Sequence, residues 1–236
     1  MKTRKLRRLK LAARFRAACH LMTRPAGITI RSTCMATLYY YHDPMCSWCW
    51  GYRPTVQKLF SSLPEGVTRT GIVGGLAPDS DQPMPEAQRE AIAGHWRRIE
   101  DLLGTEFNHD FWTKCEPRRS TYPACRAVIA AAKQGCEEEM ILGIQKAYYL
   151  EARNPSDIDM LQILAEQLGL NAETFRNDIA SSDTEVELQR QISFARASGV
   201  SGFPSLALET NGQLVPINVD YKSYEVSLQQ IQQQLV

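Results

Sequence analysis

The sequence has no apolar run long enough to cross a membrane, no acidic residue near its N-terminus and almost no net charge. A transmembrane helix needs a stretch of about 18 apolar residues, and every apolar run in this chain is interrupted well before that length. The formal net charge of +1 provides no overall attraction to nucleic acid or to an anionic membrane surface. We therefore expect neither nucleic acid nor membrane among the partners.

Charge is nevertheless distributed unevenly. Residues 1–35 hold ten Lys and Arg and no acidic residue, which leaves 17 basic against 26 acidic residues, a net charge of −9, in the remainder. This stretch lacks the continuous apolar core of roughly 7–15 residues that a secretion signal contains. We expect residues 1–36 to be a disordered basic leader or targeting segment, or else sequence upstream of a true start at Met35. Without a secretion signal, we expect a cytoplasmic protein.

The chain also lacks the cysteine pattern of a disulfide-stabilised or zinc-binding domain. Its seven cysteines are an odd number, and no secretion signal precedes them, so a disulfide framework is not expected. A zinc site commonly uses two CxxC pairs, or one CxxC with a histidine pair. This sequence has a single CxxC and four scattered histidines. We therefore expect no metal and no cofactor.

What the sequence does contain is an order of strands and helices typical of an α/β domain. A strand, a helix and a second strand are predicted at 37–43, 46–63 and 66–75, and such a βαβ unit implies parallel strands. Near the other end of the chain, the Asn211-Gly212 turn predicts a β-hairpin. The hairpin strands and the final helix are predicted at 205–209, 213–219 and 223–236. All elements in between are predicted to be helices, at 85–104, 122–135, 137–152, 157–169, 172–181 and 184–199.

The motif that points to chemistry is HDPMCSWCWGY at 42–52, which places Cys46 and Cys49 three residues apart where a helix is predicted to begin. Unpaired N–H groups and the helix dipole stabilise an anion there, so we expect a lowered pKa and a reactive thiolate at Cys46. Cys49, one turn later, is within reach of a mixed disulfide on Cys46. The residues alone leave two alternatives open, half of a zinc site and two ordinary buried thiols.

A second segment suits the same chemistry. Gly202-Phe203-Pro204 directly precedes a predicted strand. We expect a cis Phe203–Pro204 bond against the Cys46 sulfur, with the backbone N–H and C=O of Phe203 open to an extended substrate. The alternative is a trans proline that begins a strand. Trp48 and Trp50 are expected to add apolar surface for partner binding, although Trp50 could equally belong to the core.

Together these features resemble the DsbA-like branch of the thioredoxin superfamily. DPMCSWCWG and GVSGFPSL are most similar to the predicted cytosolic protein-disulfide isomerases of that branch, which are relatives of FrnE, and the resemblance covers about residues 37–236. It implies an α/β, thioredoxin-like fold with a large all-helical insertion. The thioredoxin-like domain would comprise residues 37–79 and 184–236, and the helical insertion residues 80–183.

The resemblance also implies roles for individual residues. Cys46 would be the attacking cysteine, Cys49 the resolving cysteine and Pro204 the cis proline opposite them. The residues expected to bind substrate are Trp48, Gly202 and Phe203. The implied activity is thiol–disulfide oxidoreductase or isomerase activity on protein or peptide thiols and disulfides, with glutathione as a further candidate partner.

Other readings stay open at this point. Kappa-class glutathione transferases share the architecture but have a serine where this chain has Cys46, and a chaperone-like binder would use the helical insertion without catalysis. Ser47-Trp48 stands where periplasmic DsbA has Pro-His, so a strong-oxidant role does not carry over. His42 is expected either to tune Cys46 or to be a hydrogen-bonded residue at the end of a strand. We expect ordinary thiols at Cys115 and Cys125, and the alternative is a second disulfide or regulatory pair.

Overall fold

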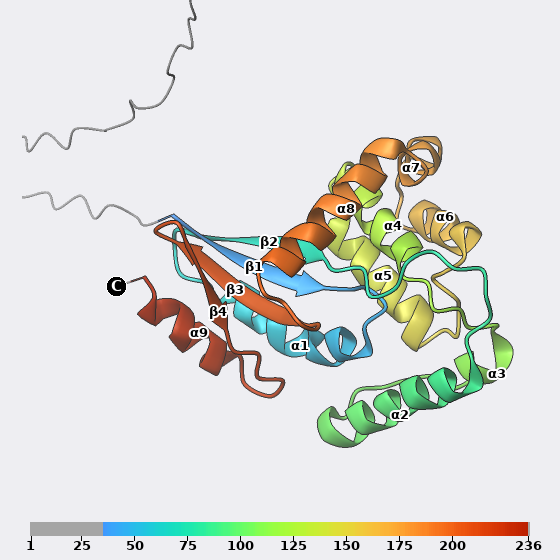
Figure 1. Cartoon of the computed structure of the whole chain (residues 1–236), viewed down its shortest axis with the longest axis horizontal. Helices are drawn as coiled ribbons and strands as arrows, with labels where there is room; N and C mark the ends of the chain where they lie inside the picture. Colours follow the sequence, from blue (N-terminus) through green and yellow to red (C-terminus); the bar gives the residue numbers. More distant parts are fainter. Residues whose placement is uncertain (1–34, 236) are drawn as a thin grey trace, which may run out of the picture. The chain divides into compact units, whose positions relative to one another are not determined.

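The computed structural model describes residues 35–235, which fall within one compact unit. Nearly all of the expected leader at 1–36 lies outside the described residues. The described part contains one four-stranded sheet with the order β2-β1-β3-β4 (Figure 1). Its strands are β1 (Ala36–His42), β2 (Val67–Val73), β3 (Ser205–Thr210) and β4 (Gln213–Ile217).

The strand pairing follows the sequence-based expectation. β1 and β2 are parallel, from Ala36 opposite Val67 to His42 opposite Val73, which confirms the βαβ unit. β3 pairs antiparallel with both β1 and β4. The hairpin turns at Asn211 and Gly212, which both have positive φ, as a tight two-residue turn requires. β1 is therefore an inner strand, and it ends next to the CxxC segment.

Successive side chains of β1 point to opposite faces of the sheet, and each face is covered by different helices. Leu38 contributes to a core with α1 (Ser47–Ser61) and α9 (Tyr224–Gln233). On the other face, Tyr41 packs in a cluster with Phe194 of α8 (Ser182–Ala197). Figure 1 shows this arrangement, with the sheet between α8 and the pair α1 and α9. α1 continues through Pro54 as one helix.

All elements between β2 and β3 are helices, as predicted. They are α2 (Glu86–Leu103), α3 (Phe111–Lys114), α4 (Tyr122–Ala132), α5 (Glu137–Tyr149), α6 (Ile158–Gln167), α7 (Ala172–Ile179) and α8. α4 is buried along most of its length, because its alanines allow neighbouring helices to approach closely. The single turn α3 was not predicted. None of the helices in residues 35–235 combines the length and apolar character needed to cross a membrane.

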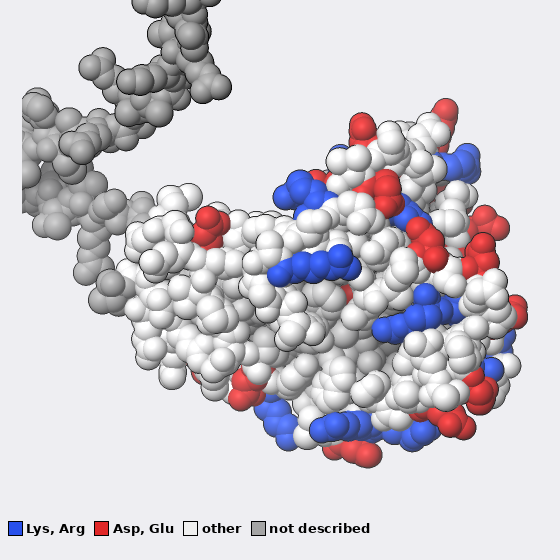
Figure 2. All heavy atoms as spheres, viewed as in Figure 1, with Lys and Arg blue, Asp and Glu red and all other residues white. Residues whose placement is uncertain are grey.

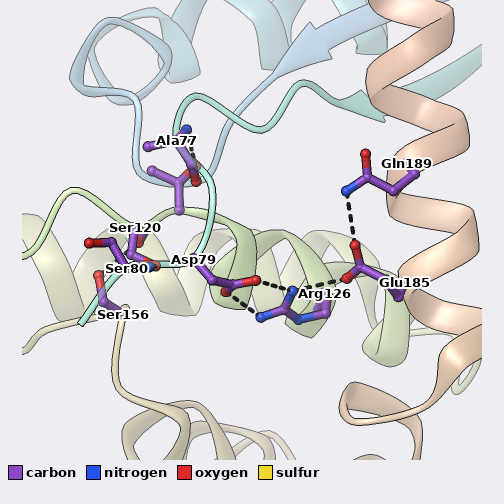
Figure 3. Close-up of polar contacts among 9 residues, drawn as sticks. Ala77, Asp79, Ser80, Ser120, Arg126, Ser156, Glu185 and Gln189 are labelled. Carbon is purple, nitrogen blue, oxygen red and sulfur yellow. Dashed lines mark hydrogen bonds and ion pairs between the residues drawn. The ribbon is translucent and has the colours of Figure 1, made fainter. Parts of the chain in front are cut away.

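Polar contacts hold the segment that leads from β2 into the helices (Figure 3). Arg126 of α4 donates to both carboxylate oxygens of Asp79, at 2.9 and 2.6 Å, and to Glu185 of α8 at 3.0 Å. The Ser80 backbone N–H donates to the Ser120 hydroxyl at 3.3 Å, and the Ser156 hydroxyl donates to the Ser120 carbonyl at 2.7 Å. These bonds fix the chain that follows the end of β2, where the CxxC segment also lies.

Candidate active site

Cys46 occupies the N-cap position of α1. Its backbone is extended (φ −84°, ψ 114°), and its carbonyl oxygen accepts the Trp50 N–H at 3.1 Å, the first bond of the helix. The Cys46 N–H donates to the Asp43 carbonyl oxygen at 3.0 Å. Cys46 therefore stands at the positive end of the helix dipole, ahead of the unpaired N–H groups of the first turn.

The sulfur of Cys46 contacts the segment around Pro204. The Cys46 thiol donates to the carbonyl oxygen of Phe203 at 3.4 Å, across 157 residues of sequence. The Phe203–Pro204 bond is cis, so both parts of this prediction, the isomer and the position against Cys46, are confirmed. The Phe203 carbonyl oxygen accepts the Cys46 thiol and keeps a second lone pair, so pairing of the Phe203 backbone with a substrate stays a prediction.

The other residues of this segment differ in exposure. Gly202 is exposed, and its carbonyl oxygen accepts the Ser205 hydroxyl at 2.7 Å, whereas Pro204 is buried. The half-buried ring of Phe203 fills the space beside Gly74, where an added Cβ would lie only 1.7 Å from its Cζ atom. The backbone of Phe203, rather than its ring, therefore faces Cys46.

The two tryptophans of the motif occupy different surroundings. Trp48 is partly exposed and lies edge-on to Tyr221, with ring centroids 5.3 Å apart, while the Arg98 guanidinium lies 5.9 Å from its ring. Trp50 stacks on Tyr149 at 5.8 Å, and both belong to an aromatic cluster between α1, α2 and α5. Trp48 also packs partly against this cluster and keeps an exposed part at the surface, whereas Trp50 is held by the stacking and by a hydrogen bond from its Nε1 to the Glu106 carbonyl at 3.1 Å.

Cys49 lies deeper than Cys46, and both are free thiols. The exposed fraction is 7% for Cys46 and 1% for Cys49. Burial raises the pKa of Cys49 well above its ordinary value, and the neighbouring Cys46 sulfur raises it further. Cys49 therefore holds its proton at neutral pH, and it can act as a nucleophile only after a neighbouring group has accepted that proton.

Asp43, to which the sequence analysis assigned no role, is a structural residue of the site. Its fully buried carboxylate accepts the N–H groups of Met45 and Leu76 and the Thr121 hydroxyl, each at 2.8 Å. The Cys125 thiol also contacts it, at 3.6 Å. Asp43 therefore ties the start of α1 to the end of β2 and to α4. The Asp-Pro pair was the available signal, because aspartate accepts a backbone N–H two residues on in such turns.

His42 is 1% exposed, and neither ring nitrogen has a hydrogen-bond partner among residues 35–235. The expectation of a hydrogen-bonded histidine was wrong, because the ring stacks on Tyr40 with centroids 5.0 Å apart instead of pairing with a polar group. Burial and the positive charge of Arg53 lower the pKa of His42 to about 4. The imidazole is therefore neutral at physiological pH.

A groove of about 380 Å³ begins at Pro204 and runs along β3 and β4. All of its lining residues are uncharged, and they include Val200, Leu214 and Asn218. Figure 2 shows few charged side chains over β3 and β4, whereas Lys, Arg, Asp and Glu gather over the helices. The groove therefore offers an uncharged surface next to the residue that contacts Cys46.

The fold and this site define a thioredoxin-like protein with a dithiol at the start of its first helix. The thioredoxin family model matches residues 39–227, so the chain belongs to the thioredoxin family. The expected thioredoxin-like fold is thereby confirmed, and so is the resemblance to DsbA-like proteins.

Two solved structures and one curated group are similar to the chain. A candidate protein disulfide isomerase from Nitrosomonas europaea is 26% identical, with a TM-score of 0.73 and coverage of 84% of this chain and 96% of that one. The cytosolic disulfide reductase DsbM from Pseudomonas aeruginosa is 28% identical, with a TM-score of 0.66 and coverage of 84% and 95%. The ClpXP adapter protein SpxH of Bacillus subtilis is 26% identical over 196 residues, which is 80% of this chain but 64% of that relative. The chain thus spans just under two thirds of the length of this curated relative.

Proposed function

We propose that this chain is a thiol–disulfide oxidoreductase that exchanges disulfides with protein or peptide partners through Cys46 and Cys49. The observation that carries the proposal is the position of the Cys46 sulfur, which lies at a helix N-terminus and 3.4 Å from the Phe203 carbonyl oxygen. The carbonyl that this thiol contacts belongs to the residue directly before Pro204, where an uncharged groove begins. The family membership and the two similar disulfide-exchange proteins support the same chemistry.

The reaction would proceed in two exchanges. The Cys46 thiolate attacks one sulfur of a substrate disulfide, which forms a mixed disulfide and releases the first substrate thiolate. Cys49 then loses its proton and attacks the Cys46 sulfur. The Cys46–Cys49 bond forms, the Cys46–substrate bond breaks and the second substrate thiolate leaves. The substrate disulfide gains two electrons, and the protein dithiol is oxidised by the same two electrons.

The groove beside Pro204 is our proposed docking surface for the substrate chain. Its uncharged lining favours an extended segment with small or apolar side chains, and Trp48 adds an aromatic surface on the other side of Cys46. A larger cavity of about 730 Å³ lies along α1 beside Trp50 and Tyr221. Neither cysteine lines either space, but the smaller groove includes Pro204, whose neighbour Phe203 contacts the Cys46 sulfur, so we place the substrate there.

The compartment and the reductant follow from the comparisons as proposals. DsbM is described as a cytosolic reductase, and a second structure of it contains GSH. We propose a cytoplasmic protein whose Cys46–Cys49 disulfide is reduced by glutathione, so that net flow is toward substrate reduction. In a cytosolic glutathione pool, a dithiol is kept largely reduced unless its own potential is lower than that of the pool.

Partner binding without catalysis is the second candidate function. The specific observation that favours it is the similarity to SpxH, which is described as an adapter protein. The groove and Trp48 would then bind a client chain, and the two thiols would remain idle.

A trapping experiment distinguishes the two candidates. Cys49→Ser keeps the attacking thiol and removes the resolving one, so it should accumulate mixed disulfides with a test protein that carries scrambled disulfides. Cys46→Ser should lose both trapping and the reduction of insulin disulfides. Cys115→Ser is the matched control, because Cys115 is a free thiol outside the site whose donated bond to the Ala152 carbonyl a serine can keep. Insulin reduction that survives in Cys46→Ser would overturn the proposal, and client binding without turnover in the unchanged protein would favour the adapter role.

A further inference from the structure

A small cavity lies beneath Cys49, on the side away from the Pro204 groove. Its volume is about 20 Å³, which is enough for a single water molecule. It is lined by Tyr40 and His42 of β1, Cys49 and Arg53 of α1, and Gln145 of α5, among others. The resolving thiol and an unpaired imidazole therefore share one enclosed space.

His42 is in the state that proton relay requires. Both ring nitrogens are buried without a partner in the described part of the chain, although a buried polar group is usually hydrogen-bonded. The depressed pKa keeps the ring neutral, so one nitrogen carries a proton and the other offers a lone pair. Such a ring can accept a proton on one side while it releases a proton from the other.

Gly71 leaves space between His42 and the partly exposed Glu137 carboxylate. The position that a Cβ on Gly71 would occupy lies 3.5 Å from His42 Nε2 and 3.0 Å from Glu137 Oε1. Glu137 begins α5 and is partly exposed, and burial together with Glu138 raises its pKa. Because residue 71 has no side chain, nothing from it separates the imidazole from this carboxylate.

The other charged groups that face His42 are already engaged. Arg53 of α1 donates to the Gln145 side chain at 3.2 Å. Glu138 of α5 accepts the Arg69 guanidinium of β2 at 2.6 Å. Glu138 also lines the cavity but is held in this ion pair, and Glu139 is exposed, so Glu137 is the carboxylate beside His42 that forms no ion pair within residues 35–235.

We propose that His42 relays the proton of Cys49 to Glu137 through the small cavity, and that this relay enables the resolving step of the proposed disulfide exchange. In the mixed disulfide, the Cys49 proton passes through a water in the cavity to the lone pair of His42, and the proton on the other ring nitrogen leaves toward the Glu137 carboxylate. The Cys49 thiolate then attacks the Cys46 sulfur, and the substrate leaves as a thiolate. When the Cys46–Cys49 disulfide is later reduced, a proton returns by the same route and restores the first tautomer.

The test uses the two-phase reaction of the reduced protein with the aromatic disulfide DTNB. Attack by Cys46 releases the first coloured thiolate, and resolution by Cys49 releases the second, so stopped-flow absorbance measures both steps in one trace. We expect His42→Phe to leave the first phase within about twofold and to slow the second phase at least about tenfold. That loss corresponds to removal of one proton-transfer group.

Gly71→Ala is the sharper variant, because it keeps both His42 and Glu137 and places only a methyl group between them. The backbone at Gly71 is ordinary strand, so alanine fits there if the Glu137 carboxylate shifts slightly. We expect a second phase slowed about threefold to tenfold, with no additional slowing when Gly71→Ala is combined with His42→Phe. Glu139→Gln, an exposed residue on the same turn, is the matched control and should leave both phases unchanged.

Two results would overturn the relay. One is a second phase within twofold of the unchanged protein in both His42→Phe and Gly71→Ala between pH 6 and 8. The other is slowing of both phases by the same factor, which would indicate a general structural defect. Absence of the first phase in the unchanged protein would instead overturn the proposed function, on which the relay rests.

Discussion

Cys46 and Cys49 stand on the same helical turn, yet they face two different kinds of surroundings. Cys46 faces the sheet side, where its thiol contacts the backbone of Phe203, the residue next to an uncharged groove. Cys49 faces a small cavity, called the helical side below, which residues of α1 and α5 line together with the half-buried Tyr40 and the buried His42 of β1. A single helix N-terminus can therefore present one thiol to a partner while it places the second thiol where surrounding side chains determine its protonation.

The largest expected effect is a difference in thiol reactivity. At pH 7, iodoacetamide should modify Cys46 at least about a hundredfold faster than Cys49, because burial and a raised pKa leave little accessible thiolate at Cys49. Mass mapping of modified peptides over time measures both rates in one sample. Similar rates at the two sulfurs would show that the surroundings of Cys46 and Cys49 do not make their thiols differ in reactivity.

The next effect concerns the Asp43 anchor at the start of α1. Asp43→Ala removes the acceptor of two backbone N–H groups and of the Thr121 hydroxyl, and leaving these buried donors unpaired should lower the free energy of unfolding by roughly 3–5 kcal/mol. Urea titration followed by tryptophan fluorescence measures the loss. Ser205→Ala, which removes one exposed hydroxyl bond on the sheet side, should cost less than about 0.5 kcal/mol. A loss below about 1 kcal/mol in Asp43→Ala would show that the anchor is not needed.

A pH series tests how the burial of His42 affects stability. The pKa of His42 is about 4 in the folded protein against 6.5 ordinarily, so as pH falls from 6.5 to 4 the unfolded chain binds a proton that the folded chain refuses. The free energy of unfolding should therefore fall by up to about 3 kcal/mol across this window and by no more below it. His42→Phe should lack this part of the loss. Urea titrations of both proteins at intervals from pH 7 to 4 measure it, and parallel curves would contradict the expectation.

The smallest effect tests the sheet side. Trp48→Ala should raise KM for a peptide disulfide by about fivefold, equivalent to roughly 1 kcal/mol of lost aromatic contact, and leave kcat within about twofold. Trp50→Ala should instead lower the free energy of unfolding by about 3 kcal/mol, because Trp50 belongs to the aromatic cluster. Steady-state kinetics with both variants, alongside thermal unfolding, separates the two roles. An unchanged KM in Trp48→Ala would remove Trp48 from the binding surface.

Most of the fold could be predicted because its signals are local. The Asn211-Gly212 turn identified the hairpin, and Gly104 marked the end of α2, whereas α4 ends at Ala132, three residues before Gly135. The single turn α3 (Phe111–Lys114) was missed, since four residues are too few to display a helical period.

Only those site residues that belong to short sequence motifs could be predicted. Cys46, Cys49 and Pro204 belong to recognisable motifs, whereas the bond between Asp43 and Thr121 joins residues 78 positions apart. Neither periodicity nor residue spacing predicts a contact between side chains that are so far apart in the sequence. The surroundings of His42 were missed for the same reason, because its neighbours come from β2 and α5 as well as from β1.

Because Gly74 contacts the Phe203 ring, the residue that can occupy position 74 depends on the residue at position 203. A Cβ at position 74 would overlap the ring, so a side chain there can be accommodated only if position 203 carries something smaller or if the loop before β3 moves away from Cys46. In any chain that keeps this site geometry, a side chain at position 74 therefore requires a smaller residue at position 203. Swapping residue 203 alone leaves a void beside Gly74, whereas swapping residue 74 alone displaces the carbonyl group that contacts the attacking thiol.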